Sequence, residues 1–157
     1  MNYAIYNNKV YIANVRNMKV RLKTRVPEQG FKELVDLAGN IHKDIFIKEV
    51  EMDNVAVIYE LYYKVIYKGK EFEAFSSEKY MLEYNKMIIS TKKSNIADQF
   101  GFIKKEQFVY DKDVQLNTID ALIEIKKPIV KSNYMKEEKT RIEQKDIKNY
   151  LKSIVVY

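Results

Sequence analysis

The chain has 157 residues, of which 46% are hydrophobic and 32% are charged, so we expect a single compact globular domain over residues 1–157. The absence of cysteine excludes a disulfide framework and a cysteine-based zinc site. The formal net charge of +6 favours an acidic partner and argues against imitation of DNA, which requires a negative field. Neither a signal peptide nor an apolar run of membrane-spanning length is apparent, so we expect no membrane association and a cytoplasmic location.

The opening segment predicts a β-hairpin followed by a further strand. Tyr3–Tyr6 and Lys9–Val15 flank Asn7-Asn8, a pair of residues that favours a tight turn. Met18–Val26 then alternates between apolar and cationic residues, which is the period of a strand with one buried face.

The next segment predicts a helix. Pro27 suits the first turn of a helix, and Gly39 suits its C-terminal end. Between them, apolar side chains recur at helical spacing, namely Phe31, Leu34, Val35 and Ala38.

The most regular pattern of the chain lies in Val55–Phe75. Apolar residues occupy every second position of its first part, and Lys68-Gly69 then marks a turn. We predict a hairpin in which Lys64 lies opposite Glu73, and we expect the sheet to be built on it. A shorter strand is predicted just before it, at Ile45–Met52.

After this hairpin the pattern changes from strands to helices. Ser77 can cap a helix whose apolar stripe runs from Tyr80 to Ile88. A second, short helix is expected from Ser94 to the stop at Gly101.

The last forty residues contain one ambiguous stretch and one predicted helix. Thr118–Lys127 suits both a helix and a strand, and Pro128 is expected to end it in either case. Further on, Thr140 and Glu143 match a capping box. The helix that they predict has an apolar stripe formed by Ile147, Tyr150, Leu151 and Ile154.

Together these elements predict an α+β fold. Residues 1–75 are rich in strands and would form an antiparallel β-sheet packed by helices, whereas residues 76–157 would be rich in helices.

No residue pattern marks a catalytic centre. His42 is the only histidine, and no glycine-rich phosphate loop follows a strand. We therefore predict that the protein is not an enzyme, with no catalytic residues, no metal ligands and no cofactor.

The best enzymatic alternative is Asp120–Lys126. If this stretch is a strand, Asp120, Glu124 and Lys126 share one face, as in metal-dependent nucleases, where carboxylates hold Mg²⁺ and a lysine supports the attacking water. Asp111 or Asp113 could replace the first aspartate. A solvent-exposed polar face is the simpler interpretation of the same residues.

The most regular polar pattern is a basic ladder on one face of the Met18–Val26 strand, formed by Lys19, Arg21, Lys23 and Arg25. Alternate residues of a strand lie about 6.6 Å apart, so these cations can follow a line of phosphates or carboxylates. The competing interpretation is a soluble outer face neutralised by acids of neighbouring strands, such as Glu49, Glu51, Glu71 or Glu73. We predict the basic ladder as the partner-binding site, and a basic nucleic-acid-binding module stays open as an alternative.

Three segments carry a resemblance to a known family. They are the opening MNYAIYNNKVYIANV, the strand-rich first half through EFEAFSSEKYMLEYNKM, and the closing KDIKNYLKSIVVY. On these segments the whole chain resembles the small anti-CRISPR proteins of bacterial mobile elements, specifically inhibitors of type II-A Cas9 of the staphylococcal kind. These inhibitors share no common signature, so no functional residue is transferred by the resemblance.

The resemblance implies a non-enzymatic inhibitor that binds Cas9 or its guide-RNA complex and blocks DNA cleavage. The blocked step would be DNA loading or movement of the nuclease domains, and the nuclease lobe is one candidate surface. Cas9 is then the expected partner in the bacterial cytoplasm, and direct contact with nucleic acid is permitted but not required.

Overall fold

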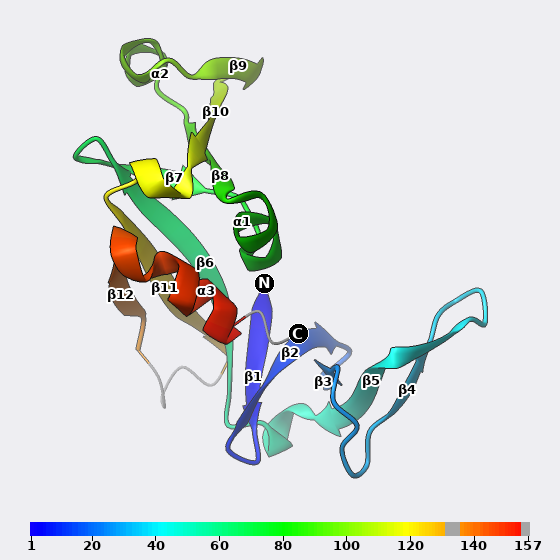
Figure 1. The fold of residues 1–157 in the computed structure, drawn as a ribbon. Helices are drawn as coiled ribbons and strands as arrows, with labels where there is room; N and C mark the ends of the chain where they lie inside the picture. Colours follow the sequence, from blue (N-terminus) through cyan, green and yellow to red (C-terminus); the bar gives the residue numbers. More distant parts are fainter. Residues whose placement is uncertain (131–135, 155–157) are drawn as a thin grey trace. The chain divides into compact units, whose positions relative to one another are not determined.

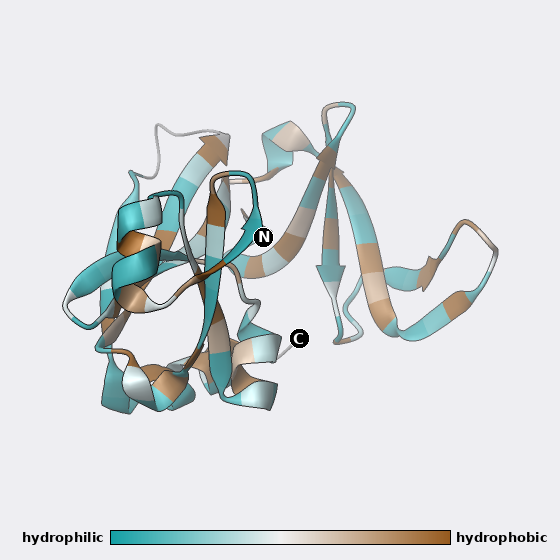
Figure 2. Cartoon of the chain, turned by 90° about the horizontal axis from the view of Figure 1, so that it is seen from above, coloured by the Kyte–Doolittle hydropathy of each residue, from teal (hydrophilic) through white to brown (hydrophobic). Residues whose placement is uncertain are grey.

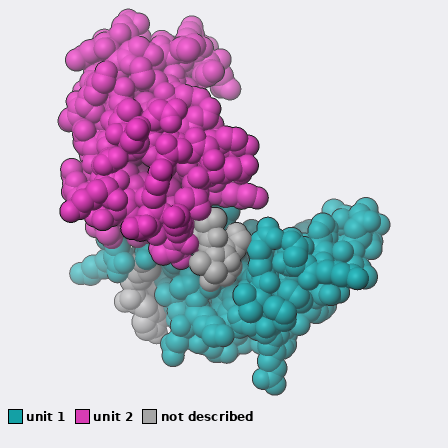
Figure 3. All heavy atoms as spheres, viewed as in Figure 1, with its two compact units in different colours: residues 1–61, 126–138, 157 teal, residues 62–125, 139–156 magenta. Residues whose placement is uncertain are grey.

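The computed structural model describes residues 1–130 and 136–154, and the chain divides into two compact units (Figure 1, Figure 3). Of the described residues, unit 1 comprises 1–61, 126–130 and 136–138, and unit 2 comprises 62–125 and 139–154. Antiparallel β-sheet dominates both units. Within the described ranges, none of the helices combines the length and the apolar character that crossing a bilayer requires.

Unit 1 is an antiparallel sheet in the strand order β4-β5-β3-β2-β1-β6. Its strands are β1 (Asn2–Tyr6), β2 (Lys9–Arg16), β3 (Lys19–Thr24), β4 (Lys32–Val35), β5 (Ile41–Glu51) and the first part of β6 (Val57–Tyr67). A single 3-10 turn, η1 (Met52–Asn54), leads from β5 towards β6.

Two-residue turns with a left-handed backbone join the first three strands. Asn7 and Asn8 have φ values of 48° and 61°, and Asn17 and Met18 have φ values of 50° and 63°. Positive φ at both central residues is typical of the type I′ turn, whose twist matches that of a hairpin. The predicted opening hairpin and the strand that follows it are therefore confirmed.

The hydrophobic core of unit 1 contains Ala4, Tyr11, Ala13, Val20, Leu22, Val50, Val55 and Ile58. On β3, Val20, Leu22 and Thr24 are buried, and the residues between them point to the other face. Figure 2 shows the hydrophobic and hydrophilic bands that this alternation produces along the strands. The basic ladder therefore lies on the face opposite the core.

The helix predicted between Pro27 and Gly39 is wrong, because this segment contains β4, which pairs with β5. Phe31 stacks on Tyr11 with ring centroids 5.3 Å apart, which fixes the chain just before β4. A short helix is marginal on its own, so these tertiary contacts outweigh the helical spacing of the apolar residues. Gly39, at φ 86°, lies in the turn between β4 and β5 rather than at a helix end.

Unit 2 contains the strand order β6-β7-β8-β10-β9, and β11 pairs with β6 and β12. Its strands are the rest of β6, β7 (Lys70–Ala74), β8 (Lys86–Thr91), β9 (Ile103–Glu106), β10 (Val109–Gln115), most of β11 (Ala121–Val130) and most of β12 (Glu138–Glu143). Its helices are α1 (Glu78–Tyr84), α2 (Ser94–Phe100), α3 (Ile147–Ile154) and the 3-10 turns η2 (Leu116–Thr118) and η4 (Gln144–Asp146).

The hairpin predicted in Val55–Phe75 is confirmed as β6 and β7. Lys64 lies opposite Glu73, as predicted, and their charged atoms are 3.5 Å apart. The turn is made by Lys68 and Gly69, with φ values of 48° and 74°. Every second residue of β6 is buried, from Val57 to Tyr67.

Both helices predicted after this hairpin are present; the first is shorter than predicted, and the second has the predicted extent. Ser77 caps α1 by accepting a hydrogen bond from the Tyr80 backbone N–H at 3.2 Å. That helix ends at Tyr84, so Ile88 lies on β8 instead of on a helical stripe. Gly101 ends α2 with a left-handed φ of 70°, as predicted.

The prediction of a helical C-terminal half, and with it the predicted α+β fold class, is wrong. The ambiguous stretch is the strand β11, which continues through Pro128. Thr140 and Glu143 lie on β12, which pairs with β11, so their capping-box spacing is coincidental. Arg141 pairs with Glu143, two residues on, at 2.7 Å, the spacing of one strand face. Among the described residues only α3 remains of the predicted C-terminal helix, and the fold is mostly antiparallel β-sheet.

Candidate protein-binding surface

The structure places the basic ladder on the solvent-facing side of β3, next to β5, in the sheet of unit 1. Lys19, Arg21 and Lys23 lie on β3, and Arg25 directly follows the strand. Because β3 is held between β2 and β5 by regular antiparallel pairing, the ladder is a fixed row rather than a flexible tail.

Carboxylates of β5 neutralise most of this row. The register places Glu51 opposite Lys19 and Glu49 opposite Arg21. Arg21 donates from Nε and Nη2 to Glu49 Oε1 at 3.2 and 2.8 Å, and Lys19 Nζ lies 3.6 Å from Glu51 Oε1. The hydrogen bonds from Arg21 lower the pKa of the Glu49 carboxyl, so this pair is ionised at neutral pH.

The last two cations of the ladder differ from each other. Arg25 Nη1 donates to Asp44 Oδ2 at 2.6 Å. Lys23 lies between Ile12 and Ile47 in the register, and in the described part of the chain it forms no ion pair. We call the set of Lys19, Arg21, Lys23, Arg25, Asp44, Glu49 and Glu51 the β3–β5 face.

The β3–β5 face is therefore a mixed-charge surface, as the competing interpretation from the sequence proposed. Side chains of Arg21 and Glu49 are 48% and 51% exposed, so both charges of the pair remain accessible to a partner. Glu49 and Glu51 were foreseeable from their alternation on a predicted strand. Asp44 was not, because it precedes that predicted strand.

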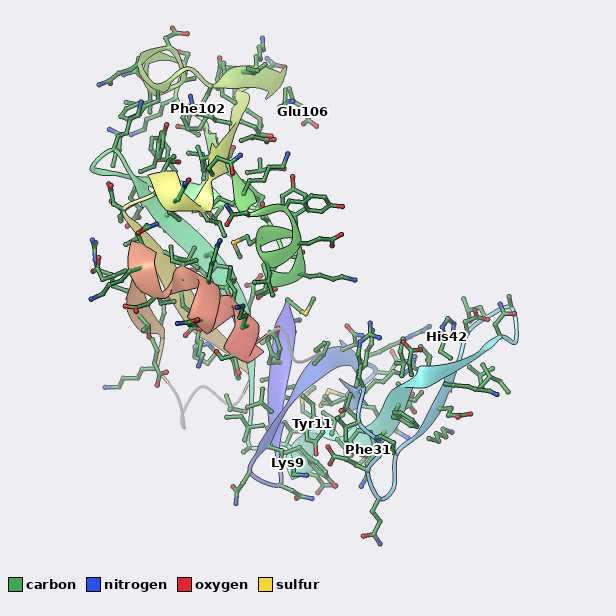
Figure 4. All side chains as sticks on the ribbon, in the orientation of Figure 1. Lys9, Tyr11, Phe31, His42, Phe102 and Glu106 are labelled. Carbon is green, nitrogen blue, oxygen red and sulfur yellow. The ribbon has the colours of Figure 1, made fainter. Side chains whose placement is uncertain are left out.

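An ordered turn closes the hairpin of β4 and β5. Asp36 accepts hydrogen bonds from the backbone N–H groups of Ala38 and Asn40, both at 2.9 Å, and its Oδ2 lies 3.2 Å from His42 Nε2. Hydrogen bonds from Asn40 and His42 hold the pKa of the Asp36 carboxyl well below its ordinary range. His42, labelled in Figure 4, lies near the start of β5, and its contact with Asp36 supports the turn.

This turn exposes apolar side chains. Leu37 is fully exposed at its tip, and Val35 and Ile41, which lie opposite each other at the end of the hairpin, are more than half exposed. The ion pairs of the β3–β5 face follow β5 towards this tip, ending at Asp44. The tip thus places an exposed apolar surface beside the mixed-charge face.

The other face of unit 1 has a shallow cavity of about 320 Å³ bordered by Lys9, Tyr11, Phe31 and Lys48. The first three of these residues are labelled in Figure 4. Its polar groups largely satisfy one another: Tyr11 and Lys9 donate to Glu28 at 2.8 and 3.2 Å. The bond from Tyr11 lowers the pKa of Glu28. The ammonium of Lys48 lies 5.9 Å from the centre of the Phe31 ring. These contacts anchor the segment that leads into β4.

Of the residues of the nuclease alternative, Glu124 and Lys126 lie on the strand β11 and Asp120 directly precedes it, but all three are already engaged. Asp120 accepts a hydrogen bond from the Gly69 N–H at 2.9 Å, and the Lys126 ammonium lies 5.9 Å above the Tyr59 ring. Glu124 is buried and accepts a hydrogen bond from Tyr150. Over residues 1–130 and 136–154, no cluster of three metal-ligand side chains is found.

Glu124 belongs to a buried polar network in unit 2 that the sequence did not reveal. Tyr63 donates to Glu78 Oε1 at 3.0 Å, and its hydroxyl lies 3.1 Å from that of Tyr150. Burial raises the pKa of both Tyr63 and Tyr150, and the nearby carboxylates, Glu78 for Tyr63 and Glu124 for Tyr150, add to the effect. Both phenols therefore stay protonated and act as donors that link β6, α1, β11 and α3.

Comparison with known proteins gives one match. No curated protein and no solved structure is similar to the chain at a significant level. Residues 1–132 match the family described as Uncharacterised conserved protein UCP033725, and this range spans every element from β1 to β11. The protein therefore belongs to the family of the uncharacterised conserved protein UCP033725.

Proposed function

We propose that the protein is a non-enzymatic inhibitor that binds another protein through the β3–β5 face, and that this partner is Cas9 or its complex with guide RNA. The observation that carries the proposal is the row of three ion pairs on the β3–β5 face, in which each cation lies against a carboxylate of β5. The surface supports the class of partner, and the sequence resemblance supports its identity.

A mixed-charge face suits a protein better than a nucleic acid. Phosphates carry only negative charge, so a duplex that approached Lys19, Arg21 and Arg25 would also meet their three carboxylate partners. A protein surface can instead present charges of both signs, and such complementarity fixes register and specificity. The exposed Leu37 at the end of the same hairpin offers the kind of apolar contact that binding interfaces bury.

The first experiment mixes the purified protein with a type II-A Cas9 loaded with guide RNA. We expect a complex that elutes as one species on size exclusion and no longer cleaves target DNA. Absence of both binding and inhibition at micromolar protein, across the type II-A enzymes tested, would end the proposal. DNA cleavage by the protein alone with Mg²⁺ that is lost in Glu124→Gln would replace it with the nuclease alternative.

Charge variants test the surface itself. Arg21→Glu should weaken binding about tenfold, which corresponds to about 1.4 kcal/mol. The exchange Arg21→Glu with Glu49→Arg keeps an ion pair within the sheet but inverts the charge pattern, so it should remain folded and still bind poorly. Lys104→Glu, an exposed change of the same charge on β9, is the matched control and should bind normally. Full binding by the exchange variant would show that the partner docks elsewhere.

A further inference from the structure

A second recessed surface lies in unit 2, where β7 and β8 diverge. Their ladder contains only two pairs, Glu73 with Ser90 and Ala74 with Ile89. The preceding residues of β7, Lys70 to Phe72, pair with β6 on one edge and have no partner in the β8 ladder on the other. A cavity of about 500 Å³ opens at this point, and we call it the β7–β8 groove.

The β7–β8 groove has an apolar, well-supported floor. Phe72 and Ile96 line it and are only 4% and 8% exposed. The Phe72 ring packs on Phe100 and on Phe102, with centroids 5.2 and 5.1 Å apart (Phe102 is labelled in Figure 4). Phe75 also lines the groove, yet 70% of it is exposed. A phenylalanine this exposed beside a recess is typical of a surface that buries it on binding.

The charge around the groove is positive. Lys70, Lys92 and Lys93 line it and are exposed, and within the described residues none of the three forms an ion pair. Glu71 and Glu73 also line it, but both point their carboxylates at Lys64, at 3.2 and 3.5 Å. Lys92 and Lys93 are adjacent in the sequence. Their proximity to Lys70 at the groove depends on how β7 and β8 are paired.

We infer that the β7–β8 groove binds an extended acidic segment of a partner protein, which places an apolar side chain between Phe72 and Phe75. The three lysines would meet the acidic side chains of that segment, and its main chain would pair with the unpartnered edge of β7. This site lies in unit 2 and does not depend on the β3–β5 face or on the identity of its partner.

A polypeptide suits the groove better than a nucleic acid. The only largely exposed aromatic ring in its lining is Phe75, which gives a single stacking platform, whereas the floor is a recess. A free strand edge recognises a peptide main chain, which can continue the ladder, and offers nothing equivalent to a sugar–phosphate backbone.

The test is selection of a displayed random peptide library on the intact protein. We expect enrichment of peptides in which an aromatic or aliphatic residue is flanked by aspartate and glutamate. A selected peptide, titrated by fluorescence anisotropy, should lose at least tenfold in affinity for Lys92→Glu with Lys93→Glu, and several-fold for Phe75→Ser. Both sites are on the surface, so circular dichroism should show an unchanged fold.

The matched control is Lys104→Glu with Lys105→Glu, an equal charge change on the exposed strand β9, which should bind the peptide within about twofold of the wild type. Amide exchange should also slow at Lys70 to Phe72 when the peptide is bound. The inference is overturned if no enriched peptide depends on Lys92 and Lys93. It is equally overturned if single-stranded oligo-dT binds the groove and displaces the peptides at lower concentration.

Discussion

One tyrosine hydroxyl group has a large role in unit 2 because it donates a hydrogen bond to a buried carboxylate. Tyr150 donates to Glu124, which is 7% exposed, and contacts the hydroxyl of Tyr63. A buried carboxylate that loses a hydrogen-bond donor keeps its desolvation cost, so the phenol oxygen matters more than the area of the ring.

Tyr150→Phe should therefore lower the free energy of unfolding by about 1–3 kcal/mol, because the ring is kept and a donor to a buried charged group is lost. Urea unfolding followed by circular dichroism measures the change. Tyr62→Phe is the matched control, since Tyr62 neighbours Tyr63 on β6 but is only half buried, and it should change stability by less than about 0.5 kcal/mol. Equal effects of the two substitutions would contradict the role given to the network.

The residue pattern correctly predicted that the cations of the basic ladder lie on one face of a strand. It did not decide which of these cations form ion pairs. The alternation of β3 fixes where Lys19 and Arg21 point, and this is a local property of the chain. Their neutralisation depends on the register with β5, which brings together residues about thirty positions apart. The sequence could name Glu49 and Glu51 as candidates, but only the register decides between partners.

The turns of unit 1 show how the backbone conformation of two residues determines where one strand ends and the next begins. The turn between β2 and β3 has φ of 50° at Asn17 and 63° at Met18, and Met18 is 71% exposed. A non-glycine residue without a polar side chain is strained in this left-handed region, whereas Asn-Gly is the preferred pair for a type I′ turn.

Met18→Gly should consequently stabilise the protein by about 0.5–1 kcal/mol, because it removes the strain at positive φ without loss of buried contacts. Thermal unfolding monitored by circular dichroism reports the shift. Met18→Ala removes the same side chain but keeps Cβ, so it should give no stabilisation. If alanine stabilises as much as glycine, side-chain exposure and not backbone strain is the cause.

Secondary-structure elements were predictable from the sequence where turn-forming residues separate two stretches of alternating apolar residues, as in the hairpins of β1–β2 and β6–β7. They were not predictable where a short segment joins a sheet edge. In β4 and β12 the apolar and charged residues happen to match helical spacing, and pairing with β5 and β11 decides the outcome. The β7–β8 groove was equally hidden, because it exists only where two strands stop pairing.

For the whole molecule, net charge is a poor guide to binding. The 28 cationic and 22 acidic side chains give +6, yet the row of cations that looked most suited to phosphates is largely ion-paired. The exposed pairs contribute little to stability, but they cancel much of the local field.

We expect weak duplex DNA binding with a shallow salt dependence. Four ladder cations on four phosphates would give a log–log slope of about −3.6, whereas partial neutralisation should keep it shallower than about −2. Fluorescence anisotropy with a labelled DNA duplex over a range of salt concentrations measures this slope. A steep slope that disappears in Arg21→Ala with Arg25→Ala would restore the nucleic-acid-binding alternative.

The division into units has a consequence for synthesis of the protein. Neither unit is a continuous stretch of chain: unit 1 needs residues beyond 126, and unit 2 needs α3. A nascent chain that has reached β10 holds β6 without its partner β11. Because unpaired strand edges promote aggregation, we expect fragments that end before residue 121 to aggregate, and unit 2 to finish folding only after α3 has left the ribosome.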